Sequence, residues 1–165
     1  MYKLKGMLSM SIIIILVVAM FAACGSKKVG SSSKDFEFTY KDETVTIDSE
    51  AAKLLEKAGK AVDTKKTESC AFQGYDRTYV YDDFTIKTYS KSKTGEEYVN
   101  SIDLKTDKVA TKEDIKIGST KKDLEKAYGT VKDKFGVYTY TKGKTKLVIE
   151  VDDSDKVISI QYMKN

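Results

Sequence analysis

The strongest constraint on the fold is a regular alternation of apolar and polar residues along much of the chain. Residues 77–89 ("RTYVYDDFTIKTY") and 97–104 ("EYVNSIDL") carry aromatic or β-branched residues at alternate positions, and 136–151 and 156–163 show the same pattern. Successive side chains of a strand point to opposite faces of a sheet. These segments therefore predict antiparallel strands that bury one face.

Two segments predict helices instead. Residues 48–59 ("DSEAAKLLEKAG") place apolar residues at helical spacing, with Asp48 or Ser49 as a cap and a glycine at the end. Residues 119–129 ("STKKDLEKAYG") have the same design, with Ser119 or Thr120 as the cap. Each predicted helix precedes one group of the alternating segments.

The order of these segments predicts an α+β fold built as a tandem repeat. Each unit is expected to contain one helix followed by a three-stranded antiparallel meander, with the helices packed on one face of the sheet. The units span about 41–107 and 108–165 within a domain at 35–165, and 105–118 connects them. A hairpin is expected where "FEFTY" and "TVTID" flank "KDE".

The composition restricts the possible chemistry. The chain has no His, Trp or Pro and a single arginine, Arg77. Without His it lacks the commonest general base and metal ligand, so we expect no enzyme, no metal and no cofactor. Nucleic acid is not an expected partner, because the lysines alternate with acids and do not form a basic stripe.

The first 23 residues have the pattern of a bacterial lipoprotein signal peptide. Lys3 and Lys5 precede a mostly apolar stretch that ends in Ala22 and Ala23, directly before Cys24. This resembles a lipobox, in which diacylglycerol is attached to the cysteine and the chain is cut between Ala23 and Cys24. An uncleaved membrane anchor is the alternative interpretation. Residues 24–34 then form the lipidated cysteine and a flexible tether of Gly, Ser and Lys.

Lipidation of Cys24 would leave Cys70 without an intrachain partner. We therefore interpret Cys70 as a small buried apolar residue; a reactive or intermolecular thiol is the alternative interpretation. The same anchor would place the domain on the extracytoplasmic face of the cell membrane, held there by the lipid at Cys24.

The segment "IKIGSTKKDLEKAYG", with the strands that follow it, resembles a superfamily of bacterial lipoproteins. This superfamily includes the SmpA/OmlA (BamE-like) outer-membrane lipoproteins and the proteins that inhibit β-lactamase. Residues 41–165, in particular "SCAFQGYDRTYVYDDFTIKTY", are also similar to uncharacterised lipoproteins of Gram-positive bacteria. The resemblance implies a non-enzymatic protein that binds other proteins.

Four tyrosines at matching places in the two units are candidate contact residues: Tyr79, Tyr81, Tyr138 and Tyr140. They either lie under the helices or line an exposed aromatic sheet face. We expect a non-catalytic protein-binding module on the cell surface. The alternatives are a module that binds a small ligand or cell-wall glycan, and a structural component of envelope assembly.

Overall fold

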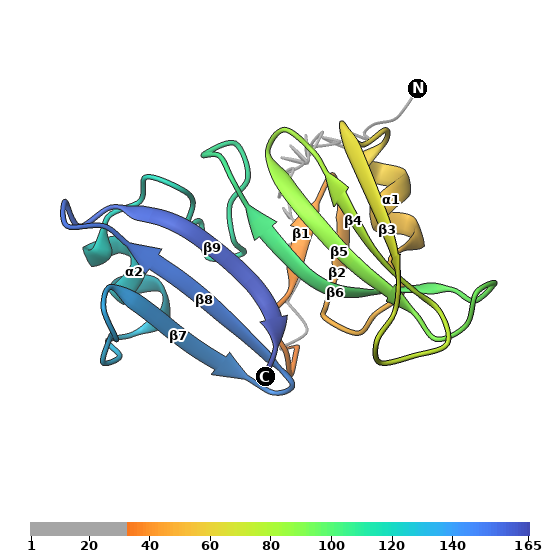
Figure 1. The fold of residues 1–165 in the computed structure, drawn as a ribbon. Coiled ribbons are helices and arrows are strands. Elements are labelled where there is room, and N and C mark those ends of the chain that lie inside the picture. Colours follow the sequence, from red (N-terminus) through yellow and green to blue (C-terminus); the bar gives the residue numbers. More distant parts are fainter. Residues whose placement is uncertain (1–32) are drawn as a thin grey trace, which may run out of the picture. The chain divides into compact units, whose positions relative to one another are not determined.

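The computed structural model describes residues 33–165, which consist mostly of β-strands (Figure 1). Among these residues lie nine strands in two antiparallel sheets and two short helices. The elements in chain order are β1 (Phe38–Tyr40), β2 (Glu43–Val45), α1 (Ala52–Ala58), β3 (Asp63–Glu68), β4 (Tyr75–Val80), β5 (Phe84–Ser90), β6 (Glu97–Leu104), α2 (Lys121–Tyr128), β7 (Val137–Lys142), β8 (Thr145–Val151) and β9 (Val157–Lys164).

The larger sheet has seven strands in the order β3-β4-β5-β6-β9-β8-β7. Hairpin loops connect β3, β4, β5 and β6 into one meander, and β7, β8 and β9 into a second. Pairing of β6 with β9 unites the two meanders in one sheet. Its register aligns one row of residues across six strands. That row consists of Tyr79, Ile86, Ile102, Tyr162, Leu147 and Tyr140.

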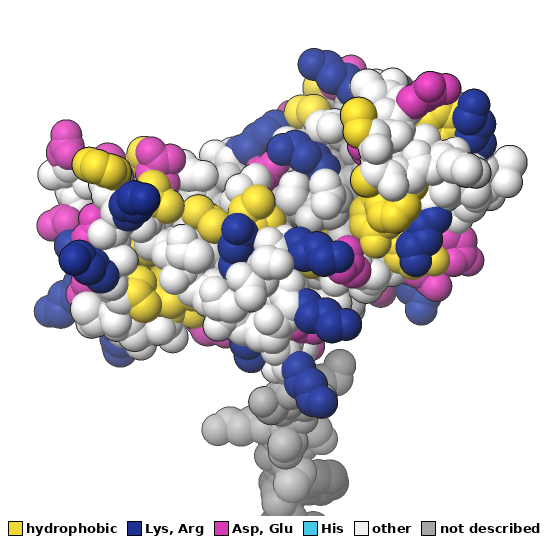
Figure 2. Space-filling model, turned by 60° about the horizontal axis from the view of Figure 1, so that its bottom comes forward, with side chains coloured by type: hydrophobic (Ala, Val, Ile, Leu, Met, Phe, Trp, Pro, Cys, Tyr) yellow, Lys and Arg dark blue, Asp and Glu magenta, His cyan; other side chains and the backbone are white. Residues whose placement is uncertain are grey.

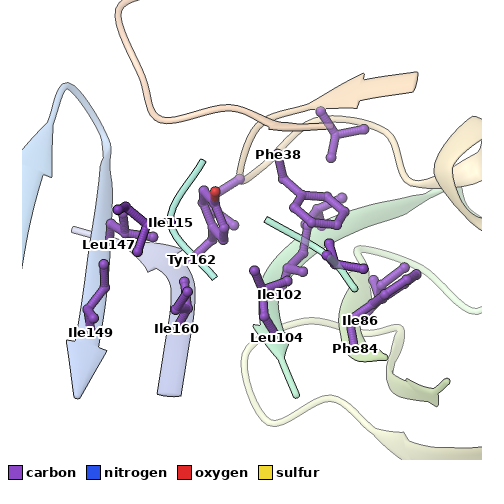
Figure 3. Close-up of a cluster of buried hydrophobic side chains, with 14 of the residues drawn as sticks. Phe38, Phe84, Ile86, Ile102, Leu104, Ile115, Leu147, Ile149, Ile160 and Tyr162 are labelled. Atoms are coloured by element: carbon purple, nitrogen blue, oxygen red, sulfur yellow. The ribbon is translucent and has the colours of Figure 1, made fainter. Parts of the chain in front are cut away.

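The hydrophobic core lies on one face of this sheet, the face that carries the row. The small sheet β1–β2 and both helices contribute to the same core, through Phe38 and Val45 and through Leu54 and Leu124. Figure 3 shows Phe38 close to the sheet residues of this core, and its ring meets that of Tyr162 edge to face at 5.7 Å. Burial of this apolar surface is the main source of stability.

The structure corrects the predicted fold class. The chain is mostly β, and it is not a tandem repeat of a helix and a three-stranded meander. The first helix is followed by four strands, because residues 63–68 ("DTKKTE") form β3 at the sheet edge. All six β3 residues are exposed. Such a strand has no buried face, so its sequence shows no apolar alternation and the pattern missed it.

The helix predicted at 48–59 begins only at Ala52. Asp48 has a left-handed backbone (φ 66°) and its N–H donates to the carbonyl of Val99 at 2.8 Å. The N–H of Ala51 donates to the carbonyl of Glu97 at 2.8 Å. Residues 48–51 therefore pair with β6 and do not form the first helical turn.

The second helix was predicted correctly. Thr120 caps α2 with its hydroxyl, which accepts from the N–H of Asp123 at 3.1 Å. The Asp123 carboxylate in turn accepts from the N–H of Thr120 at 3.3 Å, which completes a capping box. The predicted hairpin is also confirmed, since β1 and β2 pair around Lys41 and Asp42.

The antiparallel strands give the large sheet two distinct ends. The chain enters the unit at one end, where Asp35 accepts a hydrogen bond from the N–H of Lys144 at 2.6 Å. We call this the entry end; it also holds the β3–β4 and β5–β6 loops and the C-terminal Asn165. The opposite, far end holds the β4–β5 and β8–β9 turns and residues 133–136. Strands of six to eight residues separate the two ends by roughly 20–25 Å.

Residues 1–32, which include the predicted signal peptide with Ala23, the predicted lipidation site Cys24 and most of the tether, lie outside the described residues. Within residues 33–165, neither helix has the length and apolar character needed to cross a bilayer.

Candidate functional site

The four tyrosines proposed from the sequence all face the covered side of the sheet. Tyr81, Tyr138 and Tyr140 are buried, and Tyr79 is half-buried. The hydroxyl of Tyr140 donates to the carbonyl of Gly129 at 3.1 Å, at the end of α2. These residues belong to the core and its margin, and they do not line an exposed aromatic face.

Tyr79 belongs to a polar network around Glu97. Its hydroxyl donates to one carboxylate oxygen of Glu97 at 2.9 Å, and the Thr88 hydroxyl donates to the same oxygen at 2.6 Å. Arg77 lies 3.2 Å from the other oxygen. Burial, with the hydrogen bond to Glu97, raises the pKa of Tyr79 to about 12. With both oxygens engaged by these neighbours, Glu97 acts as a fixed structural anion.

A partly exposed aromatic cluster, which we call the aromatic patch, lies at the entry end. It consists of Phe72, Tyr89 and Tyr98. The ring of Phe72 stacks on Tyr89 at 5.0 Å, and Tyr89 stacks on Tyr98 at 5.6 Å. Phe72 is 42% exposed. The Tyr89 hydroxyl donates to Asp48 at 3.1 Å, which fixes the middle ring of the stack.

Two open hollows adjoin the aromatic patch, and Phe72 lines both. One measures about 500 Å³ and is lined by Glu68, Gln73, Gly74 and Lys93 as well as Phe72. The other measures about 240 Å³, and its lining includes Asp48, Asp76 and Lys164. Both have mixed polar and apolar walls. Small-molecule sites are usually enclosed and mainly apolar, so these hollows fit an extended surface better than a small ligand.

A second exposed aromatic feature lies at the far end. Phe135 is 95% exposed, the largest exposed fraction among the large apolar side chains of residues 33–165. Phe135 and Gly136 both have positive φ, 55° and 78°, between the paired residues Lys134 and Val137. This is the signature of a type I′ turn, in which Asn, Asp or Gly normally occupies the first central position.

The left-handed backbone makes Phe135 unusual in a second way. A bulky residue with positive φ carries a steric cost of roughly 1–2 kcal/mol that Asn or Gly largely avoids. Phe135 therefore combines an unfavourable backbone with an unfavourable exposure of its ring to water. Nothing in the fold of residues 33–165 requires phenylalanine at this position.

Sequence reasoning missed both exposed features. Phe72 and Tyr89 come together only through the pairing of β4 with β5, so no local pattern links them. Phe135 did have a local signal in the sequence. The pair "FG" lies between the lysine-containing segment "KDK" (132–134) and an alternating strand. Cys70 was interpreted as buried, which is wrong: it is exposed in the β3–β4 loop, two residues before Phe72.

No cluster of three His, Cys, Asp or Glu side chains in residues 33–165 is placed to bind a metal ion. Comparison with models of protein families, with characterised proteins and with solved structures finds no match to this chain. The resemblance to BamE-like lipoproteins and β-lactamase inhibitors therefore stays a prediction from the sequence.

Proposed function

We propose that this chain is a lipid-anchored, non-catalytic binding protein on the extracytoplasmic face of a cell membrane. The anchor is the diacylglycerol-modified Cys24, preceded by the signal peptide at 1–23 and followed by the tether at 24–34. The sequence of the leader supports this part of the proposal. The partner is another protein, which binds the far end of the sheet.

The observation that carries the binding proposal is the state of Phe135. Its ring is almost fully exposed and is held outward by a rigid two-residue turn. Aromatic residues that enter a pocket of a partner are frequent anchors of protein interfaces, and a preformed conformation reduces the entropic cost of binding. A binding role would offset both the backbone cost and the exposure cost of this residue.

The surroundings of Phe135 support a protein partner. Lys132 and Lys134 flank the turn on one side, and the acidic β8–β9 turn adjoins it, because the carbonyl of Gly136 accepts from the N–H of Val151 at 2.9 Å. Asp133 accepts from the N–H of Gly136 at 3.0 Å. A ring surrounded by charges of both signs resembles the apolar centre and polar rim of a protein interface.

The substitution Phe135→Asn tests the proposal by separating stability from binding. Asn suits a left-handed turn position, so this variant should be more stable than the wild type by about 0.5–1 kcal/mol in urea unfolding. The same variant should lose the partner. Residues 33–165 would be used to capture proteins from membranes, the captured protein would be purified, and its affinity for both variants would be measured by calorimetry.

Val62→Asn is the matched control, because Val62 is also an exposed apolar residue (70%) at the far end but lies beside β3, the opposite edge of the sheet from the β7 strand that follows Phe135. It should leave the affinity unchanged. If the wild type and Phe135→Asn bind the captured protein with equal affinity, the proposal that the partner contacts the far end is refuted. Capture of no protein, together with binding to purified wall glycan, would refute the protein-binding proposal itself.

The anchor has a separate test. Cys24→Ala should abolish metabolic labelling with palmitate and release the protein from the membrane fraction. Unchanged labelling would contradict the lipid attachment at Cys24.

A further inference from the structure

We propose that the entry end of the sheet docks on the surface of the bilayer that holds the anchor. The aromatic patch would lie among the lipid headgroups, and the lysines around it would contact anionic lipid phosphates. This inference rests on the proposed lipid anchor, and it adds an orientation of the domain that the anchor alone does not give.

The first argument is the place where the tether joins the domain. The Asp35 carboxylate accepts from the N–H of Lys144, and the N–H of Phe36 donates to the Thr145 hydroxyl at 2.7 Å. These bonds fix the chain to the β7–β8 turn, at the entry end. Ten residues, 25–34, separate Cys24 from Asp35, and a chain of that length can reach at most about 33–36 Å. The entry end is therefore held close to the membrane.

The second argument is that the aromatic patch belongs to the same end. A continuous set of contacts joins it to the tether. The N–H of Asn165 donates to the carbonyl of Lys144 at 2.9 Å, and Lys164 pairs with Asp48 at 2.7 Å. Asp48 in turn accepts from the Tyr89 hydroxyl. Phe and Tyr rings are suited to the boundary between water and hydrocarbon, where an apolar ring and a polar tip are both solvated.

The third argument is the charge of this end. Figure 2 brings it forward and shows basic side chains, with some acidic ones among them, between hydrophobic patches. Two acidic residues there are paired, Asp48 with Lys164 and Glu68 with Lys93 at 3.5 Å. The acidic residues Asp76 and Glu96 of this end form no ion pair among residues 33–165. Several lysines there are also without an ion pair among these residues and can contact anionic lipid phosphates. These are Lys34, Lys91, Lys142 and Lys144.

Two of these lysines lie beside aromatic rings. Lys91 lies 5.0 Å from the ring centre of Tyr98, and Lys142 lies 5.9 Å from that of Phe36. A lysine with its apolar stem along a ring and its ammonium group toward phosphate is a favourable arrangement at a membrane surface. The far end is less suited to such a surface, because the acidic residues 152–155 adjoin Phe135 there and would repel anionic lipid. Docking at the entry end would direct Phe135 away from the membrane.

The test uses residues 25–165 joined at the N-terminus to a synthetic diacyl lipid, so that attachment does not depend on Cys24. Cys70 is then the only thiol, and its exposed position near Phe72 makes it a direct reporter of docking. A fluorophore on Cys70 would be followed in vesicles that contain lipids with nitroxide headgroups. The vesicles would consist of phosphatidylcholine alone or mixed with phosphatidylglycerol. The control carries the fluorophore at the far end, in the double variant Cys70→Ser, Ser154→Cys.

Docking predicts strong quenching at Cys70 in vesicles with phosphatidylglycerol, weak quenching in phosphatidylcholine alone, and relief by high salt. The far-end fluorophore should be quenched in neither. Phe72→Ser should lower the docking equilibrium constant roughly tenfold, as expected for loss of a buried aromatic ring. Phe135→Ser should leave it unchanged.

Several outcomes would overturn the proposal. Equal quenching at the two labelled positions would show that the domain has no preferred orientation. The fluorophore on Cys70 could remain unquenched in the vesicles while the Cys70 thiol is protected from a thiol reagent in native membranes alone. This result would show that a protein, and not lipid, covers the entry end. Palmitate labelling of the native chain tests the anchor independently, so failure of docking and failure of lipidation give different results.

Discussion

The two helices of this protein occupy similar positions but are specified in different ways. Each follows a short segment that pairs with a strand, residues 48–51 with β6 and residues 118–120 with β9. Thr120 has an extended backbone (φ −81°, ψ 153°), so its side chain caps α2. Ala51 at the start of α1 has a helical backbone and no side-chain oxygen to accept a capping hydrogen bond. Local chemistry therefore defines the start of α2, whereas strand pairing defines the start of α1.

The largest expected effects would show whether both helices are equally part of the core. Leu54 in α1 and Leu124 in α2 are both completely buried. Replacement of either by Ala should lower the free energy of unfolding by about 2–5 kcal/mol, measured by urea titration, because each leaves a cavity in the same core. Val62→Ala, at an exposed position, is the control. A loss below about 1 kcal/mol for Leu54→Ala would break the comparison, since α1 would then contribute little to packing.

A smaller effect tests the difference between the two caps. Thr120→Ala should cost about 1 kcal/mol of unfolding free energy, because it removes the hydroxyl that accepts from Asp123. Ala51→Ser adds a capping residue by sequence, but it should not stabilise α1. Ala51 is buried and its backbone is not extended, so the new hydroxyl would be desolvated without a partner. Stabilisation by Ala51→Ser would show that α1 is specified locally after all.

The smallest effects concern the ends of the helices. The Tyr140 hydroxyl donates to the carbonyl of Gly129, which follows α2, at 3.1 Å. The Tyr81 hydroxyl lies 3.5 Å from the carbonyl oxygen of Gly59, which follows α1. Tyr140→Phe should lower the unfolding free energy by about 1 kcal/mol, the net value of one hydrogen bond. Tyr81→Phe should have a smaller effect, because its contact is at the limit of hydrogen bonding. Thermal unfolding of both variants against the wild type would measure the difference, and equal losses would contradict it.

The exposed features show a related limit of sequence reasoning. The four tyrosines were chosen because they recur at matching positions, yet the register of the sheet directs them inward, where Tyr140 and Tyr79 end the same row. The residues that do reach the surface come from different elements. Phe72 lies in a loop and Tyr98 in β6, and both meet Tyr89 of β5. No pattern along the chain indicates which side of a strand will be covered.

The elements that depend only on neighbouring residues could be predicted from the sequence. These are the strands with apolar alternation, the helix capped by Thr120, and the turn of the first hairpin, because periodicity and capping act over only a few residues. Tertiary structure decided the rest. The pairing of 48–51 with β6 delayed the start of α1, and β4 recruited the fully exposed segment 63–68 as a fourth strand. Pairing between distant strands supplies hydrogen bonds that no local pattern records, and it also decides which aromatic rings remain exposed to a partner or a membrane.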